Sequence, residues 1–545
     1  MLLFIRISAD IFFILWVDGP STSASTTESA SPSISTSQES LSNETDESAL
    51  FPEDITALNE TERKLLANRA KQHGNTYYAR GDLKDAIRLY TQAIALHADP
   101  MFYSNRAACY LRTKQWLEVI ADTSAALELA PRYVKAISRR AQAFEAMGMW
   151  NEALKDWTSL AVLEGFKVQS TLEASDRVIH QLAEARATEL TQSRAKKLPS
   201  GAFVTAYMQA FHAHSPEALA IHLSLVPKTE GDAVLRRVLQ LLKDTKWLEA
   251  FGLLDEALAK PLSPTQNNVA MILQGTREFL MGDPRAAISF FTKVLAKDKS
   301  NTEAMIKLGS CYMELGDSEE AINRFNMAEA ANKHNPDIYY HRAQVRFLLE
   351  DLDKALTDYQ RAIELNPDFL FSYIQMAVTL YKSKKHDEAE ALFKKTLDQF
   401  PDRFETWNYY GEILMDQQRL DEAEAAFKRS LELDTEKRSP LALINQAILA
   451  SQVRKDLAAA EALCQEALQR DAECEVAYNQ LAQVYLQQQR FPEAIRCYDQ
   501  VIDIVRNPVE LLGMISCREA AAVQYYVMEK FPEDMRKLQA SIGGA

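Results

Sequence analysis

The sequence is poor in the residues that interrupt helices. It has 16 glycines and 18 prolines in 545 residues, both below average usage. So few turn formers and strand breakers favour an all-helical protein. Its six cysteines include no CxxC pair, so neither a zinc site nor a disulfide framework is indicated. We expect reduced, buried thiols.

A surplus of positive charge is also missing. The formal net charge is -15, whereas general nucleic-acid binding needs basic residues to neutralise phosphates. We therefore expect no nucleic-acid partner, although a local basic patch is compatible with this charge.

The sequence has no GxGxxG, GxSxG, P-loop or HExxH motif. His212 and His214 have no third metal ligand nearby in the sequence. An enzyme with a repeat-built substrate arm was one possibility, but the repeats described below extend to about residue 508 and leave no room for a catalytic domain. We expect no enzyme activity, no metal and no cofactor.

A long hydrophobic run is absent as well. The longest apolar run near the N-terminus covers residues 11–17 and follows Arg6 and Asp10, whereas a membrane-spanning helix needs about 20 residues. A signal-peptide core, a shortened membrane anchor and an artefact of the gene model all remain open. Of the 30 residues 21–50, 16 are Ser or Thr, which is typical of a disordered tether. Residues 1–59 are therefore predicted to be an apolar segment plus a tether.

What the sequence does have is a period. The small residue near the start of each predicted second helix recurs in steps of 34 residues, from Ala287 through Ala321, Ala355 and Ala389 to Ala423. Further copies centre on Ala86, Val119, Ala153, Ala250, Ala460 and Ala494. The pattern predicts eleven helix-turn-helix units, three before a gap and eight after it.

Each unit places small and aromatic residues at fixed positions, as Trp407, Gly411, Leu414, Ala423 and Phe427 do in one unit. This pattern resembles the tetratricopeptide repeat, which implies an all-α superhelix with a concave groove. We expect a three-repeat domain at residues 60–163, a helical connector at 164–230, and eight repeats at 231–545 that end in capping helices.

Five polar residues of the first three units face one short stretch of the predicted groove. They occur in "KQHGN", "YSNRAACY" and "VKAISRR", and they are Lys71, Asn75, Asn105, Lys135 and Arg139. Cationic and amide donors gathered in this way suit a ligand with carboxylates. The alternative is a solvated basic face. The five residues are similar to the dicarboxylate clamp of co-chaperone repeat domains, and this resemblance implies binding of the C-terminal Glu-Glu-Val-Asp of cytosolic heat-shock chaperones.

The later units present a more apolar inner face, which could bind the apolar side of a peptide helix. The candidate groove residues are Ile306, Met313, Tyr340, Gln344, Phe347, Ile374, Tyr381 and Asn408. The alternative is that part of this stripe is core between units.

The whole layout, with "FYSNRAACY", "DIYYHRAQ" and "ISCREAAA", resembles the large chaperone-docking receptor subunit of the mitochondrial outer-membrane translocase. The resemblance implies a receptor with its repeats facing the cytosol. Its implied partners are chaperone tails, hydrophobic carrier-type preproteins with internal signals, and other translocase subunits. A soluble cytosolic co-chaperone scaffold using the same clamp is the alternative.

Overall fold

The computed structural model describes residues 58–543, and this part of the chain is helical with no strand. The all-α prediction is therefore confirmed for these residues. Our predictions for the apolar segment and for nearly all of the tether concern residues outside the described range. Among residues 58–543, no helix combines the length and the apolar character needed to cross a membrane.

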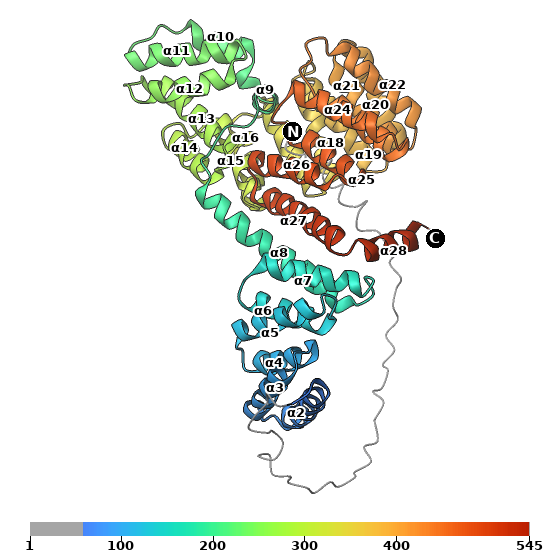
Figure 1. Cartoon of the computed structure of the whole chain (residues 1–545). Helices are drawn as coiled ribbons and strands as arrows, with labels where there is room; N and C mark the ends of the chain where they lie inside the picture. Colours follow the sequence, from blue (N-terminus) through green and yellow to red (C-terminus); the bar gives the residue numbers. More distant parts are fainter. Residues whose placement is uncertain (1–57, 544–545) are drawn as a thin grey trace. The chain divides into compact units, whose positions relative to one another are not determined.

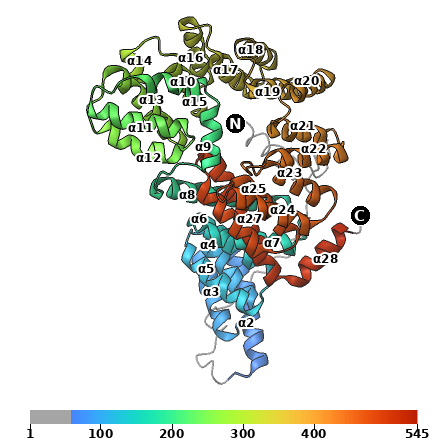
Figure 2. The same cartoon turned by 90° about the horizontal axis from the view of Figure 1, so that it is seen from above.

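The described chain forms two compact units (Figures 1 and 2). The N unit contains residues 58–192 and 512–543, and the C unit contains residues 193–511. We expected the second domain to begin at residue 231 and to keep the C-terminal helices. The compact units instead place residues 193–230 with the later repeats and residues 512–543 with the first three.

Three helix pairs and one long helix make up the first part of the N unit. They are α2 (Glu60–Arg80), α3 (Leu83–Leu96), α4 (Pro100–Arg112), α5 (Trp116–Leu129), α6 (Val134–Ala146), α7 (Trp150–Leu163) and α8 (Gln169–Ser193). The C-terminal helices are α27 (Pro508–Lys530), which enters the N unit at Leu512, and α28 (Pro532–Gly543).

The C unit opens with three short helices, α9 (Gly201–Gln209), η3 (His212–His214) and α10 (Pro216–Ser224). Eight helix pairs follow. They are α11 (Glu230–Lys243) with α12 (Trp247–Leu258), α13 (Pro264–Leu280) with α14 (Pro284–Lys297), α15 (Thr302–Glu314) with α16 (Ser318–Ala331), α17 (Pro336–Leu348) with α18 (Leu352–Leu365), α19 (Leu370–Lys382) with α20 (His386–Gln399), α21 (Phe404–Asp416) with α22 (Leu420–Leu433), α23 (Leu441–Ile448) extended by η4 (Leu449–Val453) with α24 (Leu457–Arg470), and α25 (Glu475–Gln487) with α26 (Phe491–Ile504).

The periodic small residue is buried in every helix pair. The eleven side chains that marked the repeats in the sequence all lie in the first turns of second helices and have no exposed surface. A small side chain at this position allows the two helices of a pair to approach closely. Three pairs precede the gap and eight follow it, as the sequence predicted.

The turn between the two helices of each pair has a recurring backbone conformation. Five residues before each buried small residue, the backbone adopts positive φ, and this holds in all eleven pairs. Glycine occupies only four of these positions, at Gly81, Gly148, Gly282 and Gly316. The other seven are ordinary residues, which carry a strain of order 1 kcal/mol in this conformation. The packing of the two helices therefore determines the turn more than glycine does.

Glycine is required where a first helix crosses the aromatic ring of its partner. A Cβ on Gly411 would lie 2.5 Å from the Phe427 ring, and one on Gly309 would lie 2.6 Å from the Phe325 ring. The spacing of 16 residues between glycine and ring recurs at Gly74 and Tyr90. The aromatic ring takes the volume that a side chain would otherwise fill.

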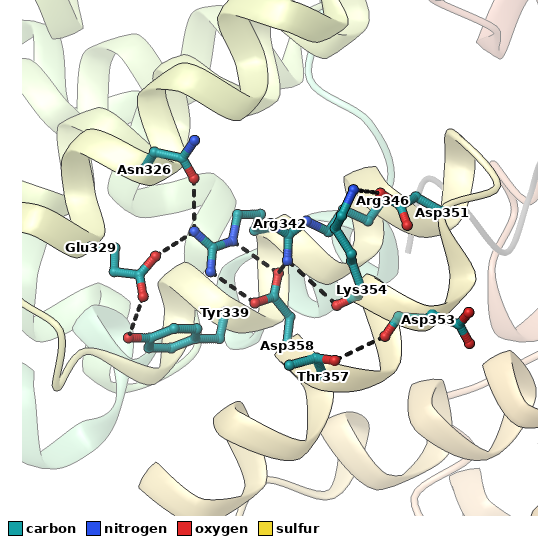
Figure 3. Close-up of polar contacts among 10 residues, drawn as sticks. All are labelled: Asn326, Glu329, Tyr339, Arg342, Arg346, Asp351, Asp353, Lys354, Thr357 and Asp358. Carbon is teal, nitrogen blue, oxygen red and sulfur yellow. Dashed lines mark hydrogen bonds and ion pairs between the residues drawn. The ribbon is translucent and has the colours of Figure 1, made fainter.

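A buried ion pair with the same spacing joins the two helices of three pairs. Arg342 donates from Nε and Nη2 to the two oxygens of Asp358, at 2.9 and 2.8 Å, and also to Glu329 and Asn326 of the preceding helix (Figure 3). Arg106 with Asp122 and Arg140 with Asp156 repeat this two-bond contact in the N unit. These bonds satisfy both charges, which is the condition under which a buried pair is tolerated.

The C-terminal helices join the N unit through apolar contacts. Val523 packs in the core that contains Trp157 of α7 and Val178 of α8, while Val527 and Phe531 bury against Val162. An ion pair between Arg132 and Asp534 at 2.6 Å adds to this contact. Burial of these apolar side chains is the physical reason that the chain end belongs to the N unit rather than to the last repeats.

Candidate peptide-binding sites

The five predicted clamp residues all lie on first helices of the N unit. Lys71 and Asn75 are on α2, Asn105 is on α4, and Lys135 and Arg139 are on α6. Asn75 and Lys135 are exposed, and the other three are half-buried. Neither lysine has a hydrogen bond or an ion pair with another described residue. Their ammonium groups are therefore available to a ligand.

The Asn75 amide is held in one orientation. Its Oδ1 accepts a hydrogen bond from the Tyr90 hydroxyl at 2.7 Å and another from Asn105 Nδ2 at 3.2 Å. With the oxygen occupied by two donors, the Asn75 NH₂ group is left to donate to a ligand. The contact also brings the two amides predicted from separate repeats side by side.

The Arg139 guanidinium is anchored on α4. Nη1 donates to the carbonyl oxygen of Ser104 at 2.7 Å and also to the Ser104 hydroxyl. Burial lowers the pKa of Arg139 from its ordinary value, but an arginine remains charged in proteins. The anchored side chain presents its other donors with little loss of rotamer freedom on binding.

A cavity of about 710 Å³ adjoins this part of the groove. Lys135 and Arg139 line it, together with Arg112 on α4 and Glu145 on α6. Its opposite wall comes from α8, which contributes Thr171, Ala174 and Arg177. The first turns of this helix, which we assign to the connector, therefore adjoin the candidate site.

Sequence reasoning missed Tyr90 and Ser104, which orient the clamp. Tyr90 occupies the aromatic position of a second helix, α3. Ser104 lies next to Asn105 within the quoted "YSNRAACY". Nothing in a single sequence indicated that these hydroxyl groups would bond to residues of another helix, because those contacts form only when the helices pack.

The predicted cargo residues fall into two groups. Five are buried and three are half-buried. The buried ones are Ile306, Tyr340, Phe347, Ile374 and Asn408, and the half-buried ones are Met313, Gln344 and Tyr381. Burial of these five fits the alternative that part of the stripe is core, and their contact with cargo stays a prediction. Direct binding of cargo by the other three stays a prediction.

An amide and carboxyl cluster lies further along the C unit. Asn408 and Asn445 each donate a hydrogen bond to Glu412, at 2.8 and 2.9 Å. Asn445 also donates to Asn408 at 3.1 Å. Burial raises the pKa of Glu412 to about 7. This cluster spans two neighbouring first helices and is polar where we expected an apolar lining.

Comparison with known proteins agrees with this architecture. Profiles described as tetratricopeptide repeat match residues 71–133, 278–346, 336–369 and 372–403. A profile described as the TPR domain of cytochrome c-type biogenesis protein H matches residues 393–508. The chain is a tetratricopeptide-repeat protein.

Several of its named relatives are import receptors of mitochondria. The chain is 30% identical to human mitochondrial import receptor subunit TOM70 over 254 residues, which are 44% of this chain and 41% of that protein. It is 33% identical to the yeast receptor over 128 residues, 24% of this chain and 21% of that one. The crystal structure of yeast Tom70 matches with a TM-score of 0.54 at 28% identity, over 88% of this chain and all of that one.

These matches confirm the resemblance to the import receptor. In sequence, the chain aligns with only about two fifths of the length of the mammalian relatives. The human and yeast relatives are named as receptor subunits.

Proposed function

We propose that this protein is an import receptor of the mitochondrial outer membrane with its repeats facing the cytosol. It docks cytosolic heat-shock chaperones through the N unit. It binds hydrophobic, carrier-type preproteins in the groove of the C unit, and it transfers them to the other subunits of the translocase.

The clamp geometry is the observation that carries this proposal. Two free ammonium groups, an anchored guanidinium and two hydrogen-bonded amides lie on three successive first helices of the N unit, and Lys135 and Arg139 line one cavity. A peptide ending in Glu-Glu-Val-Asp offers two carboxylates at its last residue, and each can accept charge-assisted hydrogen bonds of about 1.5–3 kcal/mol. The similarity to import receptor subunits supports the cellular role.

Calorimetry with a peptide ending in Glu-Glu-Val-Asp tests the docking step. Arg139→Ala should weaken binding by roughly 1.5–3 kcal/mol, because it removes a charge-assisted donor. Binding to the wild-type protein should also weaken as salt concentration rises.

The same peptide with a C-terminal amide is the ligand control, and it should bind poorly. Arg132→Ala is the matched protein control, since Arg132 pairs with Asp534 and does not line the cavity. Equal affinity of wild type and Arg139→Ala for the free-acid peptide would overturn the docking proposal.

A further inference from the structure

Residues 203–214, which we call the inner segment, pack against the first helices α13, α15 and α17 of the C unit. The Phe211 ring stacks on His341 of α17 with 4.2 Å between ring centroids. Lys307 of α15 places its Nζ 3.6 Å from the centroid of the same ring. First helices line the concave side of such a superhelix. The inner segment therefore lies where a peptide ligand would bind.

The groove also holds the backbone of the inner segment. The His212 backbone N–H donates to Asp337 Oδ2 at 2.9 Å, and His341 Nε2 lies 3.2 Å from the Ala210 carbonyl oxygen. Both groove residues are on α17. Contacts to backbone groups do not depend on the sequence of the bound segment. A different polypeptide could make them equally well.

The chemistry beneath the inner segment differs from that of a permanent core. Lys307 is 1% exposed, and its nearest acid is Glu303 at 3.8 Å. Neither the Lys307 ammonium nor Glu303 Oε1 makes a hydrogen bond to a described residue. Burial lowers the pKa of Lys307 to about 8. Burying charged groups without hydrogen bonds opposes folding, so this cover is less favourable than an apolar one.

The cover also packs incompletely. A cavity of about 160 Å³ remains between α10 and the inner faces of α11, α13 and α15. His214 and His222 line it beside Glu303 and a set of leucines. His214 Nε2 makes no hydrogen bond to a described residue and lies 3.4 Å from Glu303 Oε1. A void lined by such groups leaves the segment with fewer stabilising contacts.

We propose that the inner segment is an intramolecular stand-in for a ligand. When it is displaced, the groove of α15 and α17 takes a segment of an unfolded partner polypeptide. That segment would place an aromatic side chain between Lys307 and His341 and a backbone N–H on Asp337. This inference rests on the proposed function. It adds that the groove of α15 and α17 recognises cargo and that the inner segment covers this groove when no cargo is bound.

The test uses the full chain and a synthetic, end-blocked, fluorescent peptide of residues 201–216. In Phe211→Ala the internal competitor is weakened, so the peptide should bind about tenfold or more tightly than it binds the wild-type protein. Adding His341→Ala should abolish this gain, because it removes the stacking partner and the contact to Ala210. Phe166→Ala is the control, since Phe166 is an exposed aromatic residue of the N unit, and it should behave as wild type.

A second measurement tests the same inference if the Phe211→Ala variant does not fold. A protease site inserted at residues 225–229, between α10 and α11, allows the folded wild-type chain to be cut there. Cutting loosens the tether of the inner segment, so its effective concentration falls and the peptide should bind more tightly.

Equal peptide affinity for cut and uncut protein overturns the inference, as does an unchanged affinity in a folded Phe211→Ala variant. Binding of the Glu-Glu-Val-Asp peptide is measured in parallel on every form. Loss of that binding alone counts against the proposed function and leaves this inference standing.

Discussion

At the scale of single residues, polar groups in both units are oriented by hydrogen bonds with neighbouring residues. Tyr90 and Asn105 hold the Asn75 amide, and Ser104 holds Arg139. In the C unit, Asn408 and Asn445 hold the Glu412 carboxyl. Orientation before binding reduces the entropy that a ligand must overcome.

Glu412 should make the stability of the C unit depend on pH. Burial raises its pKa from 4.5 to about 7, so the folded state holds this proton more tightly than the unfolded state does. The stabilising contribution is complete below pH 4.5 and is lost as the pH rises through about 7. Relative to Glu412→Gln, the wild-type protein should lose about 1–3 kcal/mol of unfolding free energy between pH 5 and pH 8.

Urea unfolding at both pH values measures this difference. Glu388→Gln, an exposed position on α20, is the matched control and should show no such change relative to wild type. If the wild-type and Glu412→Gln curves shift in parallel with pH, Glu412 does not retain its proton in the folded state.

At the scale of elements, the helix pair is stabilised by close approach. Three features accompany this close approach of the two helices. They are the eleven buried small residues, the left-handed turns and the glycine–aromatic contacts. Every pair has the first two of these features. A substitution at one helix crossing should therefore destabilise mainly its own pair, and the same substitution in another pair should cost a similar amount of stability.

Gly411→Ala tests the glycine–aromatic contact. The added Cβ would lie 2.5 Å from the Phe427 ring, so the ring or the helix must shift, and we expect a loss of about 1–3 kcal/mol of unfolding free energy. Chemical denaturation followed by circular dichroism measures it.

Gly252→Ala is the matched control. Gly252 lies on α12, is exposed, and has no atom within 4 Å of an added Cβ. It should therefore stabilise the protein by roughly 0.5–1 kcal/mol, through helix propensity alone. A Gly411→Ala variant as stable as wild type would show that the crossing tolerates a side chain.

At the scale of the whole molecule, the clamp and the groove of the C unit belong to different compact units. They share no residue, and their chemistry differs. The proposed clamp offers free cationic donors, whereas α15 and α17 place Lys307 and His341 against the Phe211 ring and Asp337 and His341 against backbone groups of the inner segment.

A chaperone tail peptide and an apolar preprotein segment should therefore bind together. Saturating Glu-Glu-Val-Asp peptide should change the affinity of a purified carrier segment by less than about 0.5 kcal/mol, since separate sites act nearly independently. Fluorescence titration with and without the peptide measures this. The amidated tail peptide is the control, and displacement of the carrier segment by the free-acid peptide would contradict independent sites.

Much of the fold was predictable because the same short residue pattern recurs in every repeat. The 34-residue period placed all eleven helix pairs, and helical spacing placed five clamp residues on the first helices of the N unit. The apolar stripe was less predictable, because a first helix presents apolar side chains both to the groove and to the next unit. Ile306, Tyr340 and Phe347 are buried in the same apolar cluster as Phe211 of the inner segment, a contact that no repeat position indicates.

The sequence by itself determined the repeat, its helices and the helix positions of the five proposed clamp residues, because these follow from residues close together in the chain. Only the tertiary structure decided that Phe211 rests on His341, that Ser104 anchors Arg139, and that residues 512–543 join the N unit. Each of those contacts joins segments that are far apart in the sequence. Their stability comes from burial and hydrogen bonding that exist only after the helices have packed.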